Sequence, residues 1–229
     1  MEPPSTQALR VALDDSQSVS ALLDLPDEAW AGYVFAHGAG AGMGHRFMAD
    51  FAHGLAGRGI ATLRFQFPYM EQGSKRPDAP KVAHTAVRAA VAEAARRLPG
   101  LPLLAGGKSF GGRMSSQAQA LSPLAGVRGL AFVGFPLHPA GKPADERAAH
   151  LSDVELPMLF LQGTRDELAE LALLQAVVER LGHRATLELF DDADHAFHVR
   201  ARSGRNDAQT RDAMLDAMAA WARSITGGG

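Results

Sequence analysis

The sequence predicts an α/β fold with a mostly parallel sheet of about seven to eight strands and helices on both of its faces. Short apolar runs alternate with helical patterns of 10 to 18 residues along most of the chain, which is typical of βαβ units. With 229 residues, 46% of them hydrophobic, the chain can bury one large core. We therefore predict a single domain over residues 1–229, with loose tails at 1–7 and 226–229.

Composition excludes several classes of function. A net charge of −2 and a pI near 6.5 provide no extended field for nucleic acid or an anionic membrane. The absence of cysteine excludes disulfides, thiol catalysis and cysteine-ligated zinc. The first residues lack the basic and apolar regions of a signal peptide, and no apolar run approaches the ~20 residues of a membrane span. We expect a cytoplasmic protein that acts on a small molecule as a monomer or homodimer, without nucleic acid or membrane partners.

Eight short runs are predicted to be strands. The first two flank a polar turn and favour a hairpin. The later runs are largely apolar, as buried strands of a parallel sheet are, and Pro68 closes the fourth of them. In chain order the runs cover residues 8–13, 19–25, 31–36, 60–67, 101–105, 127–135, 156–162 and 185–190.

Five segments repeat apolar residues at helical spacing. The first begins at Phe47 and is ended by the glycines at 57 and 59, and the others cover residues 82–98, 110–121, 168–181 and 207–225. Residues 69–80 are predicted as a polar loop, and residues 137–151 as a connector rich in proline and charge. The roughly twenty residues between Phe135 and Leu156 are too few for a lid of several helices, so we predict a minimal cap.

One strand-to-helix junction carries a catalytic motif. Gly107-Lys108-Ser109-Phe110-Gly111 is a G-x-S-x-G sequence in the strand–turn–helix context of a nucleophile elbow. Such a serine occupies a strained turn that lifts its hydroxyl above the sheet. Side chains at the two glycine positions would collide with the neighbouring strand and helix. We therefore predict that Ser109 is a nucleophile.

Three competing motifs fail. The elbow ends like a phosphate-binding loop, but Pro102 stands where that motif requires its first glycine. The glycine loop after Ala36 does not form a dinucleotide fingerprint, because Met43 and His45 occupy the positions of the third glycine. No group of His, Asp or Glu shows metal-ligand spacing. We predict no cofactor and no metal.

The ends of two later strands supply partners for Ser109. The run 156–162 leads to Asp166, and the run 185–190 leads through an acidic turn to His195. In such sheets functional residues gather at the carboxyl ends of the strands. A serine hydroxyl needs a base to accept its proton, and the base needs a carboxylate to orient it. We predict the triad Ser109, Asp166 and His195.

Each partner has rivals. Asp191, Asp192 and Asp194 are alternative acids, but they lie too close to His195 in sequence to reach behind its ring comfortably. Asp166 could also cap the helix that follows it. His198 is the alternative base, and we favour His195 because it lies immediately past the strand within the acidic turn.

The tetrahedral intermediate of acyl transfer requires backbone donors. We assign these to the amide N–H of Phe110 and to that of Ala39 in the loop after Ala36, with Gly40 as the fallback. His37 is expected to pack beneath this loop. With a minimal cap the pocket should be shallow and open, and we predict that its border contains Met43, Tyr69, Met70, Leu137, His138 and Phe197.

Five segments resemble a known family. They are residues 37–43 (HGAGAGM), 107–113 (GKSFGGR), 135–143 (FPLHPAGKP), 161–166 (LQGTRD) and 193–197 (ADHAF). Together they resemble the small, nearly lidless α/β-hydrolases of the dienelactone-hydrolase-like group, closest to the bacterial branch related to NSL-complex subunit 3 and testis-expressed proteins. The resemblance implies the α/β-hydrolase fold and a serine triad. Dienelactone hydrolases proper use a Cys nucleophile, so their substrate is not transferred.

Two hypotheses follow for the function. The first is a serine hydrolase that cleaves an ester, thioester or amide with a small or protruding acyl group through an acyl-enzyme. The second is a catalytically silent binding or scaffold protein of the same fold, as the resemblance to subunits of a chromatin complex allows. A large exposed apolar patch, or an elbow blocked by Lys108 or Tyr69, would favour the second.

Overall fold

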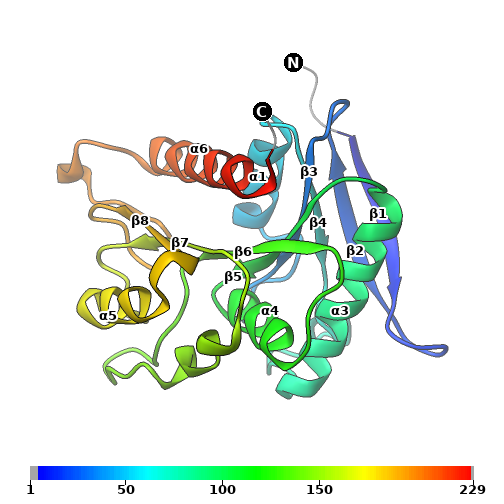
Figure 1. Cartoon of the computed structure of the whole chain (residues 1–229), viewed down its shortest axis with the longest axis horizontal. Coiled ribbons are helices and arrows are strands. Elements are labelled where there is room, and N and C mark those ends of the chain that lie inside the picture. The colour runs from blue at the N-terminus through cyan, green and yellow to red at the C-terminus, as the bar shows by residue number, and fades with distance from the viewer. Residues whose placement is uncertain (1–4, 228–229) are drawn as a thin grey trace.

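The computed structural model describes residues 5–227 and contains one eight-stranded sheet (Figure 1). The strand order is β1-β2-β4-β3-β5-β6-β7-β8. The strands are β1 (Ser5–Ala12), β2 (Ser18–Leu25), β3 (Ala31–Ala36), β4 (Ile60–Phe65), β5 (Leu103–Lys108), β6 (Val127–Val133), β7 (Met158–Gly163) and β8 (Ala185–Phe190). This is the predicted α/β-hydrolase fold with its mostly parallel sheet.

Strand pairing determines where a site can form. β1 and β2 form the predicted antiparallel hairpin, and β2 also pairs antiparallel with β4. All pairs from β4 through β3 to β8 are parallel. The chain moves outward from β3 to β4 on one side and then returns to β5 on the other. The loops after β3 and β5 therefore separate at a topological switch point, where ligands bind in open α/β sheets.

Helices cover both faces of the sheet (Figure 1). α1 and α6 pack on one face, and α3, α4 and α5 pack on the other. Among residues 5–227, no helix has the length and apolar character to cross a bilayer. The helices are α1 (Arg46–Ala56), α2 (Pro68–Glu71), α3 (Pro80–Arg97), α4 (Phe110–Leu121), α5 (Leu171–Leu181) and α6 (Asp207–Thr226), with 3-10 helices η1 (Glu146–Asp153), η2 (Gly182–Arg184) and η3 (Ala201–Ser203).

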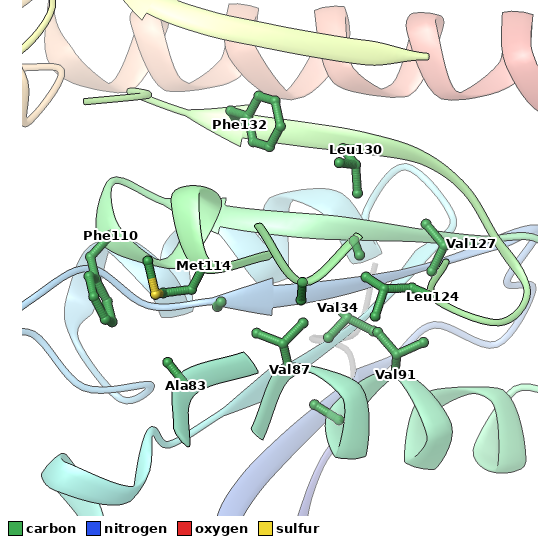
Figure 2. Close-up of a cluster of buried hydrophobic side chains, with 14 of the residues drawn as sticks. Val34, Ala83, Val87, Val91, Phe110, Met114, Leu124, Val127, Leu130 and Phe132 are labelled. Carbon is green, nitrogen blue, oxygen red and sulfur yellow. The ribbon is translucent and has the colours of Figure 1, made fainter. Parts of the chain in front are cut away.

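Each face has its own apolar core. Figure 2 shows the larger one, where Val87 and Val91 of α3 point toward Val34 of β3. Met114 and Phe110 of α4 continue the same layer. The Ala-rich face of α3 allows its backbone to approach the sheet closely, since alanine adds little bulk between helix and strand.

Several boundaries differ from the predicted ones. Residues 5–7, predicted as part of a loose tail, pair with β2, and residue 226, predicted as the start of the other tail, belongs to α6. Residues 1–4, 228 and 229 lie outside the described part. The predicted loop at 69–80 opens with the single turn of α2, which Pro68 initiates. The connector contains η1, and α5 begins at Leu171 because residues before it bond to the loop after β6.

A buried ion pair links β2, β4 and the loop after β3. Asp24 is 0% exposed and Arg64 is 2% exposed. Arg64 Nε and Nη2 lie 3.0 and 2.8 Å from Asp24 Oδ2, and Thr6 donates to Asp24 Oδ1 at 2.7 Å. Arg64 Nη1 also donates to the carbonyl oxygen of Met43 at 3.0 Å. The pair is therefore well satisfied, and removal of Arg64 alone would leave the Asp24 carboxylate buried with only Thr6 and His53 beside it.

We predict that Arg64→Met lowers the free energy of unfolding by about 3–5 kcal/mol, because Asp24 would stay buried without its counter-ion. Urea unfolding at neutral pH measures this. Arg46→Met is the control, since the Arg46 side chain is 91% exposed and lies 3.7 Å from Asp50. An exposed pair of this kind contributes less than about 1 kcal/mol. Equal losses in the two variants would contradict the prediction.

Candidate active site

The elbow places Ser109 in a strained backbone conformation. Ser109 has φ 50° and ψ −114°, a region that residues other than glycine rarely adopt. A Cβ atom at Gly107 would lie 2.4 Å from the carbonyl oxygen of Ala36, and one at Gly111 would lie 2.3 Å from it. Both positions require glycine because the first turn of α4 presses against the end of β3. The hydroxyl of Ser109 is thereby carried to the carboxyl edge of the sheet.

Three predicted residues from separate loops meet at this edge. His195 Nε2 lies 2.8 Å from Ser109 Oγ, and His195 Nδ1 lies 2.6 Å from Asp166 Oδ2. Asp166 is 5% exposed and also accepts hydrogen bonds from Gln162 Nε2 and the amide of Leu168. The carboxylate fixes the proton of His195 on Nδ1, which leaves Nε2 free to accept from the Ser109 hydroxyl.

The rival side chains are engaged elsewhere. Asp192 pairs with Arg200, whose Nε donates to it at 2.8 Å. Asp194 Oδ1 accepts from the amides of Ala196 and His198 and so shapes the turn that carries His195. Asp191 is exposed. His198 Nδ1 lies 2.8 Å from Asp207, which raises the pKa of this exposed imidazole.

His37 supports the loop after β3 from below. Its Nδ1 lies 2.8 Å from the carbonyl oxygen of Gly38, and its Nε2 accepts from the amide of Phe67 at 3.0 Å. Only a neutral ring with its proton on Nδ1 makes both bonds. Burial lowers the pKa of His37 to about 4, against the effect of the Gly38 carbonyl. His37 therefore packs beneath this loop, as predicted.

The two amides assigned to an oxyanion hole have no protein acceptor. Within residues 5–227, neither the Phe110 nor the Ala39 N–H donates a hydrogen bond to another group. The fallback, Gly40, lies beside Tyr69. Burial raises the pKa of the Tyr69 hydroxyl, and the backbone of Gly40 opposes this rise. The Gly40 amide also donates no hydrogen bond among these residues, but Ala39 lines a cavity beside Ser109 and Gly40 does not, which makes Ala39 the better candidate.

The far end of the same loop is held by β4 and the residues after it. The amide of Met43 donates to Gln66 Oε1 at 2.8 Å, and its carbonyl accepts from Arg64 Nη1. Both backbone groups of Met43 are thus satisfied by buried or half-buried side chains. The loop is fixed at both ends, at Gly38 by His37 and at Met43 by this pair of side chains.

A cavity of about 370 Å³ opens beside Ser109 and His195. It lies between the loop after β3, the start of α1 and the loop that carries His195. Its lining is mainly apolar and includes Ala39, Ala41, Phe47, Met48, Leu168 and Ala196, with the polar side chains of His45 and Lys108. In the described part of the chain, no three His, Asp or Glu side chains are grouped closely enough to hold a metal ion.

Comparison with known families matches residues 30–223 to the alpha/beta hydrolase domain. The chain belongs to the alpha/beta hydrolase family.

Solved structures with a similar fold include dienelactone hydrolase from Anabaena variabilis, at 19% identity and a TM-score of 0.77, with 98% of this chain and 99% of that one covered. An α/β serine hydrolase without a lid from Xanthomonas campestris has 22% identity and a TM-score of 0.73, with 96% and 97% covered. An esterase from Pyrococcus furiosus has 15% identity and a TM-score of 0.74, with 97% and 93% covered. At such identities the likeness is one of fold.

The predicted border of the pocket is wrong for this hydrolase. None of its six residues lines the cavity at Ser109, and four are buried in the core: Tyr69, Leu137, His138 and Phe197. The loop after β6 folds back onto the start of α5, where His138 Nε2 accepts from the amide of Glu170. Met43 and Met70 are partly exposed but lie outside the lining.

The sequence did not predict on which side of Ser109 the cavity of this α/β hydrolase lies. The missed lining residues include His45, Phe47 and Met48, which follow the glycine loop and open α1. Their position offered a signal, because α1 begins directly after the glycine loop, and Gly38 of that loop lies close to Ser109. Two further lining residues adjoin predicted site residues in the sequence. Leu168 lies two residues after Asp166, and Ala196 lies one residue after His195.

The hydrolase should lose stability as the pH falls below the ordinary histidine pKa. His37 and His150 both have a pKa near 4 in the fold; for His150, burial and then the charges of Arg113 and His84 lower it, against Asp153. In the unfolded chain these two histidines take up protons near pH 6.5, whereas in the fold they stay neutral at this pH. We predict that the free energy of unfolding falls between about pH 7.5 and about pH 5. One fully buried histidine of this kind contributes about 2 kcal/mol to the fall.

Urea unfolding across this pH range measures the loss. His150→Gln removes one of the two groups, so the variant should lose less stability than the wild type and still lose the part due to His37. A free energy of unfolding that stays constant over the range, or an unchanged slope in the variant, would contradict the prediction.

Proposed function

We propose that this α/β hydrolase is a serine hydrolase that cleaves a carboxylic ester, thioester or amide through an acyl-enzyme. The observation that carries the proposal is the continuous chain from Ser109 Oγ to His195 at 2.8 Å and from His195 to Asp166 at 2.6 Å. These groups come from three loops and adopt the geometry that nucleophilic attack requires. The cavity beside Ser109 provides room for the reacting group.

The proposed reaction has two halves. Ser109 Oγ attacks the carbonyl carbon while His195 Nε2 takes the hydroxyl proton, and His195 then gives this proton to the leaving group as its bond to carbon breaks. Water attacks the acyl-enzyme with His195 again as base, which frees the acid and restores Ser109. The amides of Phe110 and Ala39 would bind the oxyanion, and one such donor contributes about 3 kcal/mol.

The alternative of a silent scaffold receives less support. Lys108 directs its ammonium to the backbone of His195, and Tyr69 packs beneath the loop after β3, so neither covers Ser109. In the described residues, the large apolar side chains exposed by more than a third are Val82, Leu121 and Leu189, on three different elements. Several proteins of similar fold are named as esterases or hydrolases, which is consistent with an enzyme.

Four features of the proposal rest on the sequence alone. They are membership of the branch related to NSL-complex subunit 3, a cytoplasmic location, a small-molecule substrate without nucleic acid or membrane partners, and action as a monomer or homodimer. The single domain over residues 1–229 also remains a prediction.

A fluorophosphonate probe tests the chemistry without knowledge of the substrate. The probe phosphonylates a serine only when a base activates it, and we expect one adduct on Ser109 by mass spectrometry. Ser109→Ala and His195→Ala should each abolish the adduct while the protein stays folded by circular dichroism. Ser152→Ala, at an exposed serine of η1, is the control and should label like the wild type. A folded wild type without an adduct on Ser109 would favour the scaffold.

The open apolar cavity predicts preference for short acyl groups. A cavity of about 370 Å³ accommodates an acyl chain of a few carbons. A longer chain would extend into solvent, so its additional carbons should add little to the binding free energy. We expect kcat/KM for p-nitrophenyl esters to be highest for short acyl chains. An optimum above about ten carbons would contradict this, because it requires an enclosed tunnel.

A further inference from the structure

The loop that carries His195 is strained and lies outside every strand and helix. Phe197 has φ 62° and Asp192 has φ 61°, and neither residue is a glycine. Only a surrounding structure that holds such residues firmly allows them to persist. Turn hydrogen bonds around Asp194 stabilise the loop internally, through the amides of Ala196, Phe197 and His198. These bonds do not attach the loop to the nucleophile.

Lys108 provides such an attachment. Its Nζ donates to the backbone carbonyl of His195 at 2.5 Å. The same ammonium lies 5.2 Å from the ring centroid of Phe197 and 5.8 Å from that of Phe47. A cation over an aromatic face is attracted to it, and more strongly when desolvated. The strained Phe197 therefore stacks on the Phe47 ring, and the ammonium of Lys108 lies close to both rings.

The space around the ammonium is shaped to this contact. A Cβ atom at Gly134 would lie 3.0 Å from Lys108 Nζ and 3.5 Å from His195 Nδ1 and Cε1. Within residues 5–227, no carboxylate lies within ion-pair distance of Lys108. Its one direct polar partner there is the His195 carbonyl. The position of this ammonium is therefore explained by its bond to the His195 carbonyl, since no counter-ion holds it there.

We propose that Lys108 is a positioning residue for the general base, which it holds by its backbone so that Nε2 remains within reach of Ser109. Lys108 and Ser109 are consecutive, and they contact His195 at opposite ends, one at the main-chain oxygen and the other at the imidazole. A displacement of about 1 Å in a reacting group lowers turnover by as much as about 100-fold. This inference rests on the proposed hydrolase function and assigns a role that the triad alone does not contain.

The attachment should depend on the charge of Lys108. Burial lowers the pKa of Lys108 to about 8, and the charges of Asp166 and Asp194 oppose this shift. The other groups around the ammonium are the His195 carbonyl and ring and the Phe47 and Phe197 rings. Loss of the proton removes the cation–π attraction and weakens the bond to the carbonyl. Turnover should therefore decline above about pH 8 through this group.

The test is Lys108→Met, which keeps an unbranched side chain against the two rings and removes the charge. We expect kcat for a short p-nitrophenyl ester to fall about 10- to 100-fold with KM changed less than about threefold. The decline of kcat above about pH 8 should be absent from the variant. Lys142→Met, at an exposed lysine of the loop after β6, should match the wild type in both respects.

Hydrogen exchange gives a second readout that needs no activity. Amides of residues 191–200 should exchange faster in Lys108→Met than in the wild type, while those of α3 remain unchanged. If the variant does not fold, the wild type at about pH 7 and about pH 9 replaces it, with rates corrected for intrinsic exchange. Loss of protection in residues 191–200 at the higher pH supports the proposal.

The outcomes separate the two proposals. A folded Lys108→Met with wild-type kcat, pH profile and loop protection would overturn the role of Lys108. A wild type that neither labels nor turns over esters would overturn the hydrolase function, and faster exchange of residues 191–200 in the variant would then still show the attachment.

Discussion

The close contact between the first turn of α4 and the end of β3 is the constraint on which the site depends. With any side chain at Gly107 or Gly111, a Cβ atom would meet the Ala36 carbonyl oxygen at 2.4 or 2.3 Å. The contact leaves Ser109 no relaxed conformation, and its φ of 50° directs the hydroxyl away from the sheet. The same contact sets the Phe110 amide at the start of α4 beside the loop that contains Ala39. This one steric requirement thus positions Ser109 and the Phe110 amide, while His37, Arg64 and Gln66 hold the loop that contains Ala39.

Around this rigid centre, each loop is held by polar groups of a neighbouring strand or loop. His37 and the pair Arg64 and Gln66 fix the two ends of the loop after β3. Gln162 at the end of β7 holds both the amide of Phe135 and the carboxylate of Asp166. Such groups are costly to bury unless all their hydrogen bonds are made, so they favour one arrangement of the loops over others. The site therefore depends on buried polar contacts as much as on the apolar core beneath it.

The sequence predicted the features that follow from local pattern and general topology. The strands, the hairpin and the elbow have short-range signals, and the convergence of Ser109, Asp166 and His195 follows because parallel strands end at one edge. The pocket border could not be predicted in this way. Tyr69 lies in a four-residue helix too short to show periodicity, and its ring is buried against His37 and Phe110. The buried His138 accepts a hydrogen bond from the amide of Glu170, which is 32 residues away in sequence. Lys108 donates to the carbonyl of His195, which is 87 residues away in sequence. Contacts of this range leave no pattern in one sequence.

These long-range contacts also decide from which side a substrate approaches. On the α3 and α4 side of Ser109, the rings of Phe67, Tyr69 and Phe110 fill the space, with Phe67 and Phe110 centroids 5.3 Å apart. On the α1 side, the loop after β3 and the loop of His195 stand apart and leave the cavity. Aromatic rings packed edge to face are costly to displace, so a ligand does not readily enter the space that they fill. An acyl or leaving group that reaches Ser109 must therefore lie toward Phe47 and Ala196, next to the loop that Lys108 holds.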